Sequence, residues 1–204
     1  MMECYILAGG QSKRFGEDKT LFSIGGMPCI QRMVQEAKEV CSEVFVVSKD
    51  TEKYRFLKDV KLLKDISEKQ LPLIGLYTAL NHTKEDRIIV LSADMPLIKS
   101  DLILYLWNKR EKNITLYEIG GKIYTFFGVY PKEILKPLEE YLKAGGVKAL
   151  DFVRAVGYTS VKESEIVQLG VPMDAFINMN TKEDARIILE LYEGSKVKDF
   201  RNDL

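Results

Sequence analysis

The chain has 204 residues, enough for one domain with a sizeable core, and its 46% hydrophobic and 29% charged content is ordinary for a folded protein. Its 30 basic and 30 acidic residues cancel, so no overall field attracts nucleic acid or an anionic membrane. No apolar run approaches the roughly 20 residues of a membrane span, and the start of the chain lacks an export signal. We therefore expect a soluble, cytoplasmic protein that binds neither nucleic acid nor membrane.

The cysteines and the histidine exclude two kinds of chemistry. Cys4, Cys29 and Cys41 are odd in number and lack metal-type spacing, which predicts reduced core residues. His82 is the only histidine and lies at a predicted helix end. A histidine-based metal site or a histidine general base is therefore not expected.

A glycine-rich basic loop follows the first predicted strand, reading L-A-G-G-Q-S-K-R-F-G-E-D-K over residues 7–19. The residues suited to bind phosphate are Gly9, Gly10 and Gly16, the cations Arg14 and Lys19, and the hydroxyl of Ser12. The glycines would allow positive φ and close approach to a ligand, and the cations would lie along a triphosphate. The spacing is neither that of a Walker A loop nor that of a dinucleotide-binding loop. On composition alone, a solvated surface connection is an equal alternative.

Helices and strands then alternate. We expect a helix from Pro28 to Cys41, strands at 43–48 and 60–63, a short helix at 54–57, a helix through Leu80 and a central strand at 87–92. This order is typical of parallel βαβ units, whose ligands bind outside the carboxyl ends of the strands. The residues directly after the apolar runs, Gly9, Ser48, Asp65 and Asp94, would then face one crevice.

Asp94 follows a continuous apolar run, in the segment Ala93-Asp94-Met95-Pro96. An ionised carboxylate at the end of a central strand costs free energy unless something compensates its charge. Mg²⁺ bound to one or two carboxylates, phosphate oxygens and water is such a compensation. The alternative is a capping or turn residue, but Ser100-Asp101 is the better cap for the next helix. Asp94 is therefore predicted to be a metal ligand.

The second half begins with a hairpin that breaks the parallel order. Residues 114–119 and 123–130 flank a Gly120-Gly121 turn, and helices are expected after Pro131 and at 147–156. Lys122, Lys148 and Arg154 are candidate contacts for an anionic acceptor, with solvated surface charge as the alternative.

The segment 175–184 carries two amides before the last helix. Asn178 and Asn180 occupy alternate positions, so both side chains point the same way if the segment is extended. Thr181 and Asp184 form a capping-type start for a helix with Ala185, Ile188, Leu189 and Tyr192 on its apolar face.

Three motifs together resemble those of the molybdenum cofactor guanylyltransferase (MobA) family, within the nucleotidyltransferases of GT-A-like Rossmann-type fold. They are L-A-G-G-x-S-x-R-F-G-x-D-K, A-D-M-P and F-x-N-x-N-T-x-E-D, and they extend from residue 7 to residue 184. Pro72, Leu73 and Gly75 also keep three letters of the family's G-P-L-x-G. Leu71 stands where the family usually has glycine, which leaves both GTP and CTP as candidate nucleotides.

The resemblance implies an α/β fold, with a three-layer, mostly parallel Rossmann-like sheet, helices on both faces and an added β-hairpin. It implies one nucleotidyltransferase domain over residues 1–204, whose first half binds nucleotide and whose second half binds acceptor. The implied activity is Mg²⁺-dependent transfer of GMP from GTP to the phosphate of molybdenum-molybdopterin, with transient contact to other proteins of that pathway. A related cytidylyl- or sugar-phosphate nucleotidylyltransferase, or a non-catalytic nucleotide-binding protein, remains open.

The resemblance also implies roles for single residues. The backbone of Leu7, Ala8, Gly9 and Gly10, together with Ser12 and Ser48, would contact the nucleotide. Arg14 and Lys19 would bind the β- and γ-phosphates, and Asp65 would bind the base or ribose. Asp94 would hold Mg²⁺ at the α-phosphate. Asn178 and Asn180 would bind the acceptor or metal-bound water, and Arg14, Lys19 and Asp94 would be catalytic. An attacking phosphate is already ionised, so catalysis needs positioning and charge neutralisation rather than a general base.

Overall fold

A mixed β-sheet organises the chain in the computed structural model, which describes residues 1–9, 15–67 and 71–202, the last seven by backbone only. Its strands are β1 (Glu3–Leu7), β4 (Glu43–Ser48), β5 (Lys61–Lys64), β6 (Arg87–Ser92), β7 (Ile114–Ile119), β8 (Lys122–Pro131) and β9 (Tyr158–Lys162). Within the described ranges they lie in the order β5-β4-β1-β6-β8-β7-β9. Only β8 runs against the others, because it pairs antiparallel with both β6 and β7, while β9 is parallel to β7. A separate small hairpin joins β2 (Ser23–Ile24) and β3 (Met27–Pro28).

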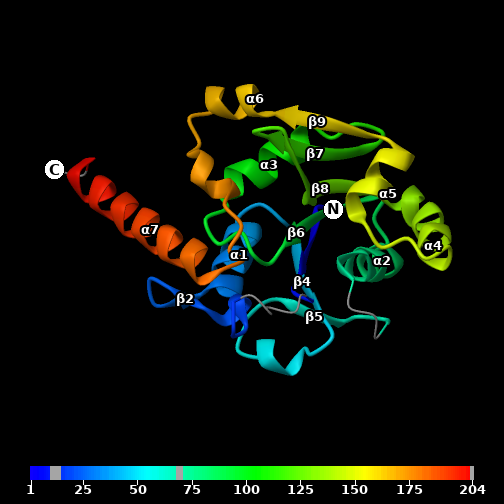
Figure 1. Ribbon diagram of the computed structural model, residues 1–204, viewed down its shortest axis with the longest axis horizontal. Helices are drawn as coiled ribbons and strands as arrows, with labels where there is room; N and C mark the ends of the chain where they lie inside the picture. Colours follow the sequence, from blue (N-terminus) through cyan, green and yellow to red (C-terminus); the bar gives the residue numbers. More distant parts are fainter. Residues whose placement is uncertain (10–14, 68–70, 203–204) are drawn as a thin grey trace.

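Helices cover both faces of this sheet (Figure 1). The α-helices are α1 (Cys29–Lys38), α2 (Pro72–His82), α3 (Ser100–Asn108), α4 (Leu135–Lys143), α5 (Ala149–Val156), α6 (Glu163–Gln168) and α7 (Lys182–Asn202), and the 3₁₀ turns are η1 (Lys19–Leu21), η2 (Glu52–Tyr54), η3 (Lys132–Ile134) and η4 (Met173–Phe176). Buried residues of α1, α3, α6 and α7 share one apolar cluster, and those of α2, α4 and α5 share the other. The predicted α/β class with three layers and an added hairpin is confirmed.

The alternation of side chains along the central strands produces these two cores. In β1, Cys4 and Ile6 point into the cluster with α1, whereas Tyr5 points into the cluster with α2. Tyr5 stacks on Phe45 of the neighbouring strand with ring centroids 4.5 Å apart. The cysteines are buried free thiols as predicted, and burial raises the pKa of the Cys29 thiol.

Local predictions failed where tertiary contacts decide the structure. The short helix expected at 54–57 is instead the 3₁₀ turn η2. Helix α3 begins at Ser100 itself, and its N-cap Lys99 makes no side-chain cap. Glu36 of α1 accepts a hydrogen bond from the Ser100 amide at 2.8 Å, so a distant carboxylate replaces the predicted local cap.

The edge strand β9 and helix α6 were not predicted. The sequence of β9, Tyr-Thr-Ser-Val-Lys, has no continuous apolar run, and of its residues only Val161 is buried. Pairing with β7 defines this strand, and a partner more than 40 residues earlier leaves no local signal.

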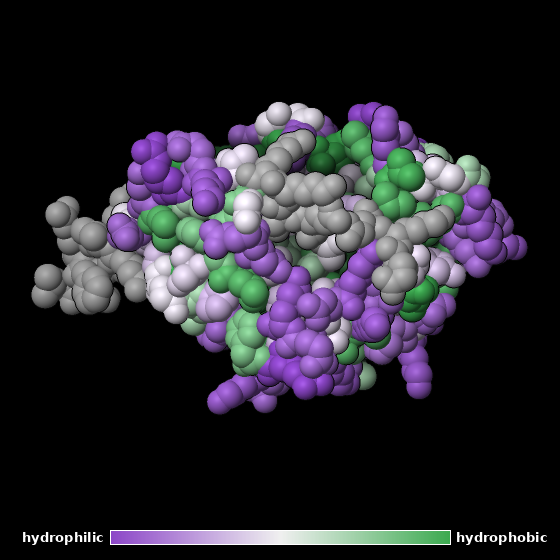
Figure 2. Space-filling view, turned by 60° about the horizontal axis from the view of Figure 1, so that its bottom comes forward, coloured by the Kyte–Doolittle hydropathy of each residue, from purple (hydrophilic) through white to green (hydrophobic). Residues whose placement is uncertain are grey.

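The last helix extends away from the sheet toward the carboxyl terminus (Figure 1). It starts with the predicted capping box, since Asp184 N donates to Thr181 Oγ1 at 3.1 Å and Asp184 Oδ2 accepts from Thr181 N at 2.7 Å. Hydrophilic residues cover much of the face shown in Figure 2, with apolar residues in small groups between them. Within the described ranges, no helix combines the length and apolar character needed to cross a membrane.

Candidate functional site

The carboxyl ends of the parallel strands meet at one edge of the sheet. Backbone pairing continues past the strands themselves, as Ala93 N donates to Leu7 O at 3.1 Å and Asp65 N donates to Ser48 O at 3.0 Å. These bonds join the end of β1 to that of β6 and the end of β4 to that of β5, and Ala8 N, which donates to Val47 O at 2.8 Å, joins β1 to β4. Asp65 and Asp94 therefore open onto the same pocket.

That pocket has a volume of about 290 Å³, at the lower end of the range for small-molecule sites. Its lining comes from the end of β1, from η1, from the start of α2, from the segment after β6, from residues 122–126 of β8, and from Asn178. Both halves of the chain thus contribute to its walls.

Asp94 is the most enclosed charge in the pocket, with 11% of its side chain exposed. Its Oδ1 accepts hydrogen bonds from Ser92 Oγ at 2.6 Å and from Asn178 Nδ2 at 3.0 Å. Its Oδ2 pairs with Lys19 Nζ at 2.9 Å. Met179 N also donates to the Asp94 carbonyl at 2.7 Å, which ties the 177–180 segment to the end of β6. Neutral donors thus hold one carboxylate oxygen and an ammonium holds the other.

The two predicted amides contact the two members of this ion pair. Asn178 donates to Asp94, and Asn180 Oδ1 accepts from Lys19 Nζ at 2.8 Å. The expectation that both side chains point the same way is confirmed. Lys19 is thus held between Asp94, which lies 75 positions later in the sequence, and Asn180, which lies 161 positions later.

A hydrogen-bonded network holds the turn η1 that carries Lys19. Asp18 caps this turn by accepting from Thr20 N at 3.1 Å and from Thr20 Oγ1 at 2.7 Å, and it forms an ion pair with Lys53. Burial acts to raise the pKa of Asp18, but the hydrogen bonds from Lys53 and Thr20 outweigh it and lower the pKa. Tyr54 OH lies 2.8 Å from Thr20 Oγ1 and completes the network. We did not predict this turn, although a capping residue, Asp18, stands two positions before Thr20 and is a local signal for it.

Asp65 also lines the pocket, beside Gly9. It accepts a hydrogen bond from Thr78 Oγ1 at 3.1 Å, and burial raises its pKa. A Cβ on Gly9 would lie 3.2 Å from Asp65 Oδ2, tighter than most real contacts. Gly9 gives room for this close approach and does not take the positive φ that we expected, whereas Gly16 does have a φ of +83°.

The structure separates the remaining predicted residues. Ser48 is buried behind the pocket, where its Oγ donates to Ala8 O at 3.5 Å, and it does not line the pocket. Leu7 and Ala8, at the end of the neighbouring strand β1, do line the pocket. Gly10, Ser12 and Arg14 lie outside the described residues.

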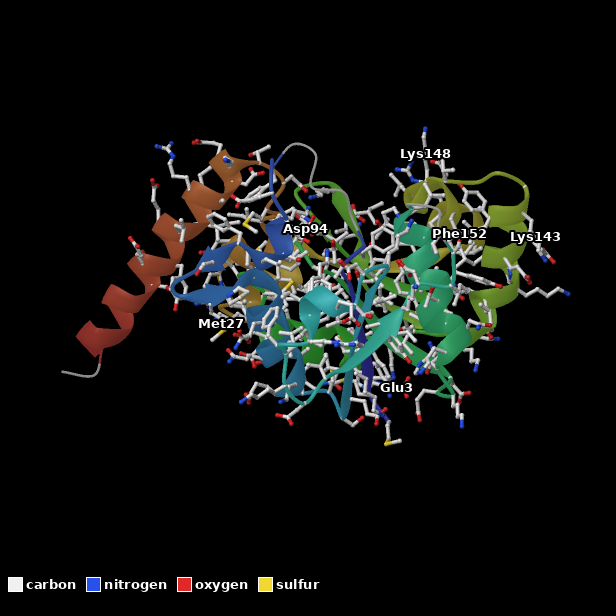
Figure 3. The ribbon with its side chains drawn as sticks, turned by 90° about the horizontal axis from the view of Figure 1, so that it is seen from below. Glu3, Met27, Asp94, Lys143, Lys148 and Phe152 are labelled. Carbon is white, nitrogen blue, oxygen red and sulfur yellow. The ribbon has the colours of Figure 1, made fainter. Side chains whose placement is uncertain are left out.

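The three acceptor candidates of the second half are also separated. Lys122 lines the pocket, whereas Lys148 and Arg154 do not. Figure 3 shows Lys148 well apart from Asp94. The aromatic residues of β8 that share the lining, such as Tyr124, were missed because a hairpin pattern does not reveal which end of the hairpin faces a ligand.

The described part of the chain offers a metal ion no preformed cluster of ligands. No group of three or more His, Cys, Asp or Glu side chains is arranged there to hold one. A single carboxylate such as Asp94 is enough for Mg²⁺, which takes one or two protein carboxylates and completes its shell with phosphate oxygens and water.

Comparisons with known proteins identify the family of the chain. Residues 4–156 match the family described as the MobA-like NTP transferase domain. A protein of Aquifex aeolicus named probable molybdenum cofactor guanylyltransferase is 41% identical over 92% of this chain and 90% of its own length. A protein of Syntrophotalea carbinolica named molybdenum cofactor guanylyltransferase is 28% identical over 88% of this chain and 86% of its own length.

Solved structures share the fold. A crystal structure of an Aquifex aeolicus protein superposes with a TM-score of 0.76 at 40% identity, covering 88% of this chain and 93% of that one. Molybdopterin-guanine dinucleotide biosynthesis protein A of Archaeoglobus fulgidus superposes with a TM-score of 0.82 over 94% of this chain and 99% of that one, and at 18% identity it supports the fold alone. The sequence match over residues 4–156 and the 41% identical relative show that the chain belongs to the MobA-like NTP transferase family.

Proposed function

We propose that this chain transfers GMP from GTP to the terminal phosphate of molybdenum-molybdopterin and releases pyrophosphate. The observation that carries the proposal is the meeting of Gly9, Lys19 and Asp94 at one pocket, in a chain whose curated relatives are named for this activity.

The base would lie where Asp65, Leu71, Pro72 and Gly75 line the pocket. A carboxylate accepts hydrogen bonds, and the guanine edge offers two neighbouring donors, the ring N1–H and the 2-amino group, whereas cytosine offers its single amino group there. Asp65 therefore favours guanine. The bulk of Leu71 in place of glycine leaves CTP as the nucleotide to test against it.

The phosphates would lie between the glycine-rich turn and Asp94. Asp94 would hold Mg²⁺, which when bound neutralises charge on the phosphates. Lys19, and Arg14 from the loop, would bind the β- and γ-phosphates, and the backbone of Leu7, Ala8, Gly9 and Gly10 with Ser12 would approach the nucleotide. Among the described lining residues there is no histidine or cysteine, which suits a reaction whose nucleophile is already ionised.

The acceptor would enter from the second half of the chain. Asn178 and Asn180 reach the site from a segment anchored on Asp94, so they can orient the acceptor or metal-bound water. In this proposal one domain spans residues 1–204, with the nucleotide on its first half and the acceptor on its second. We expect it to act in the cytoplasm, in transient contact with other proteins of the pathway.

A pyrophosphate-release screen tests the function. Each of the four ribonucleoside triphosphates is supplied with Mg²⁺, either without an acceptor, with molybdenum-loaded molybdopterin or with sugar phosphates. We expect release only with GTP and acceptor together. Preference for CTP, or turnover only with a sugar phosphate, would identify a related transferase instead. Saturable nucleotide binding without turnover on any acceptor would identify a non-catalytic binding protein.

A further inference from the structure

Two lysines approach Asp94 from different sides. Lys19 Nζ contacts Asp94 Oδ2 directly at 2.9 Å. Lys122 Nζ donates to Asn178 Oδ1 at 2.9 Å, and Asn178 Nδ2 donates to Asp94 Oδ1 at 3.0 Å. Lys19 thus contacts one carboxylate oxygen of Asp94 directly, and Lys122 reaches the other through the side-chain amide of Asn178.

Lys122 also determines the orientation of the Asn178 amide. With its oxygen toward the ammonium and its nitrogen toward the carboxylate, both contacts of Asn178 are favourable. Reversing the amide would turn its NH₂ group toward the ammonium and its oxygen toward the carboxylate, and both contacts would become repulsive. The lysine therefore keeps Asp94 Oδ1 hydrogen-bonded.

Aromatic contacts hold Lys122 at the rim of the pocket. Its Nζ lies 4.3 Å from the centre of the Tyr124 ring, on the same strand. Tyr124 OH donates to Phe176 O at 2.9 Å, which links β8 to the segment that carries Asn178. The side chain is anchored although Lys122 as a whole is exposed, so its ammonium faces the pocket with capacity for a further acceptor.

The direction of the reaction gives this second ammonium a role. One oxygen of the acceptor phosphate forms the bond to the α-phosphorus while the bond from that phosphorus to the bridging oxygen of the β-phosphate breaks, and the bridging oxygen leaves with pyrophosphate. The attacking and leaving oxygens lie roughly in line. If Lys19 serves the leaving end, the attacking phosphate arrives from the opposite side of the α-phosphate.

We propose that Lys122 binds the attacking phosphate of the acceptor. The inference rests on the proposed function for the identity of that acceptor, but it requires only that the acceptor carries a phosphate. Lys122 would attract the incoming dianion and reduce its repulsion from the nucleotide, while the same ammonium keeps Asn178 in place.

Steady-state kinetics of three variants test this role. In Lys122→Met we expect the KM for molybdenum-loaded molybdopterin to rise about tenfold or more, as for loss of a charge-assisted hydrogen bond, and the KM for GTP to change by less than about twofold. Lys122→Arg should restore most of the acceptor affinity because it keeps the charge. Lys148→Met removes an exposed lysine outside the pocket and should leave both KM values unchanged.

Salt dependence adds a readout that a structural role would not change. The acceptor KM of the wild type should rise more steeply with ionic strength than that of Lys122→Met, because one charge contact is missing in the variant.

The outcomes separate this inference from the proposed function. If the wild type transfers GMP to molybdopterin and Lys122→Met keeps the wild-type acceptor KM and salt dependence, Lys122 has no such role and the function stands. If the wild type uses a different phosphate acceptor, the proposed function is wrong, and the same comparison on that acceptor decides the role of Lys122. A wild type without any transfer overturns both.

Discussion

Two buried carboxylates at opposite ends of the sheet differ in what neutralises them. Glu3 begins β1 and Asp94 follows β6. Counted over the whole residue, backbone included, their exposed fractions are similar at 7% and 8%. Figure 3 labels both and shows how far apart they lie. Glu3 accepts hydrogen bonds from two hydroxyls, those of Tyr5 and Thr83, inside the packed protein. Asp94 faces a pocket and pairs with an ammonium.

The difference shows how a fold keeps one carboxylate for structure and another for chemistry. Buried hydroxyl donors satisfy Glu3, which does not line the pocket. Lys19 satisfies one oxygen of Asp94 from the pocket side, where a metal ion and phosphates can compete for both partners. Burial alone does not distinguish the two residues.

Replacing Asp94 should have the largest effect. We expect Asp94→Ala to lower pyrophosphate release by about 10³-fold or more, because the metal and the charge neutralisation are both lost. The change lies at the end of a strand, so thermal unfolding should remain cooperative. Wild-type pyrophosphate release from a folded Asp94→Ala protein would show that Asp94 is as structural as Glu3.

Replacing Lys19 should weaken nucleotide binding according to the number of phosphates. For Lys19→Ala we expect a loss of about 10- to 100-fold for GTP, the range of a hydrogen bond to a charged group, and a much smaller loss for GMP. Calorimetric titration of both nucleotides measures this ratio. Equal weakening of GTP and GMP would mean that Lys19 only holds Asp94 in place.

Replacing Glu3 should affect stability and spare activity. Glu3→Ala removes the acceptor of the buried Thr83 hydroxyl and one of the two partners of Tyr5 OH, which also lies 3.0 Å from His82 Nδ1, and we expect this to cost about 1–3 kcal/mol of unfolding free energy. Glu3→Gln keeps an accepting oxygen and is the matched control, with a smaller loss. Denaturant unfolding and pyrophosphate release are compared for both. A loss of activity at unchanged stability would contradict the structural role.

Replacing a third carboxylate, Asp65, should have the smallest effect. Burial raises the pKa of this residue. GTP binding should weaken as the pH falls through this raised pKa, because the protonated acid no longer accepts both donors of guanine, and Asp65→Asn should lack this pH dependence. Ionised Asp65 is disfavoured in the folded state, so the Asn variant should be slightly more stable at neutral pH, and this advantage should disappear as the pH falls through the same pKa. GTP affinity and melting temperature, each measured between about pH 4 and 7, test both statements. Parallel pH profiles for wild type and variant would exclude Asp65 from base recognition.

The amino-acid sequence by itself determined the sheet class and half of the site. Continuous apolar runs specify strands buried on both faces, and in a parallel sheet the residues directly after those strands must share one edge. The gathering of Gly9, Asp65 and Asp94 followed from that rule, and it holds in the structure.

Only the tertiary structure decided which charges neutralise each other and which residues serve as support. Lys19 reaches Asp94 across 75 positions and Lys122 reaches Asn178 across 56, and Ser48 lies behind the pocket although its position resembles that of Asp94. Strand β9 and the Glu36 cap of α3 depend in the same way on partners far along the chain. Local patterns report the propensity and periodicity of a segment, whereas these contacts depend on register and packing between segments, which exist only once the chain is folded.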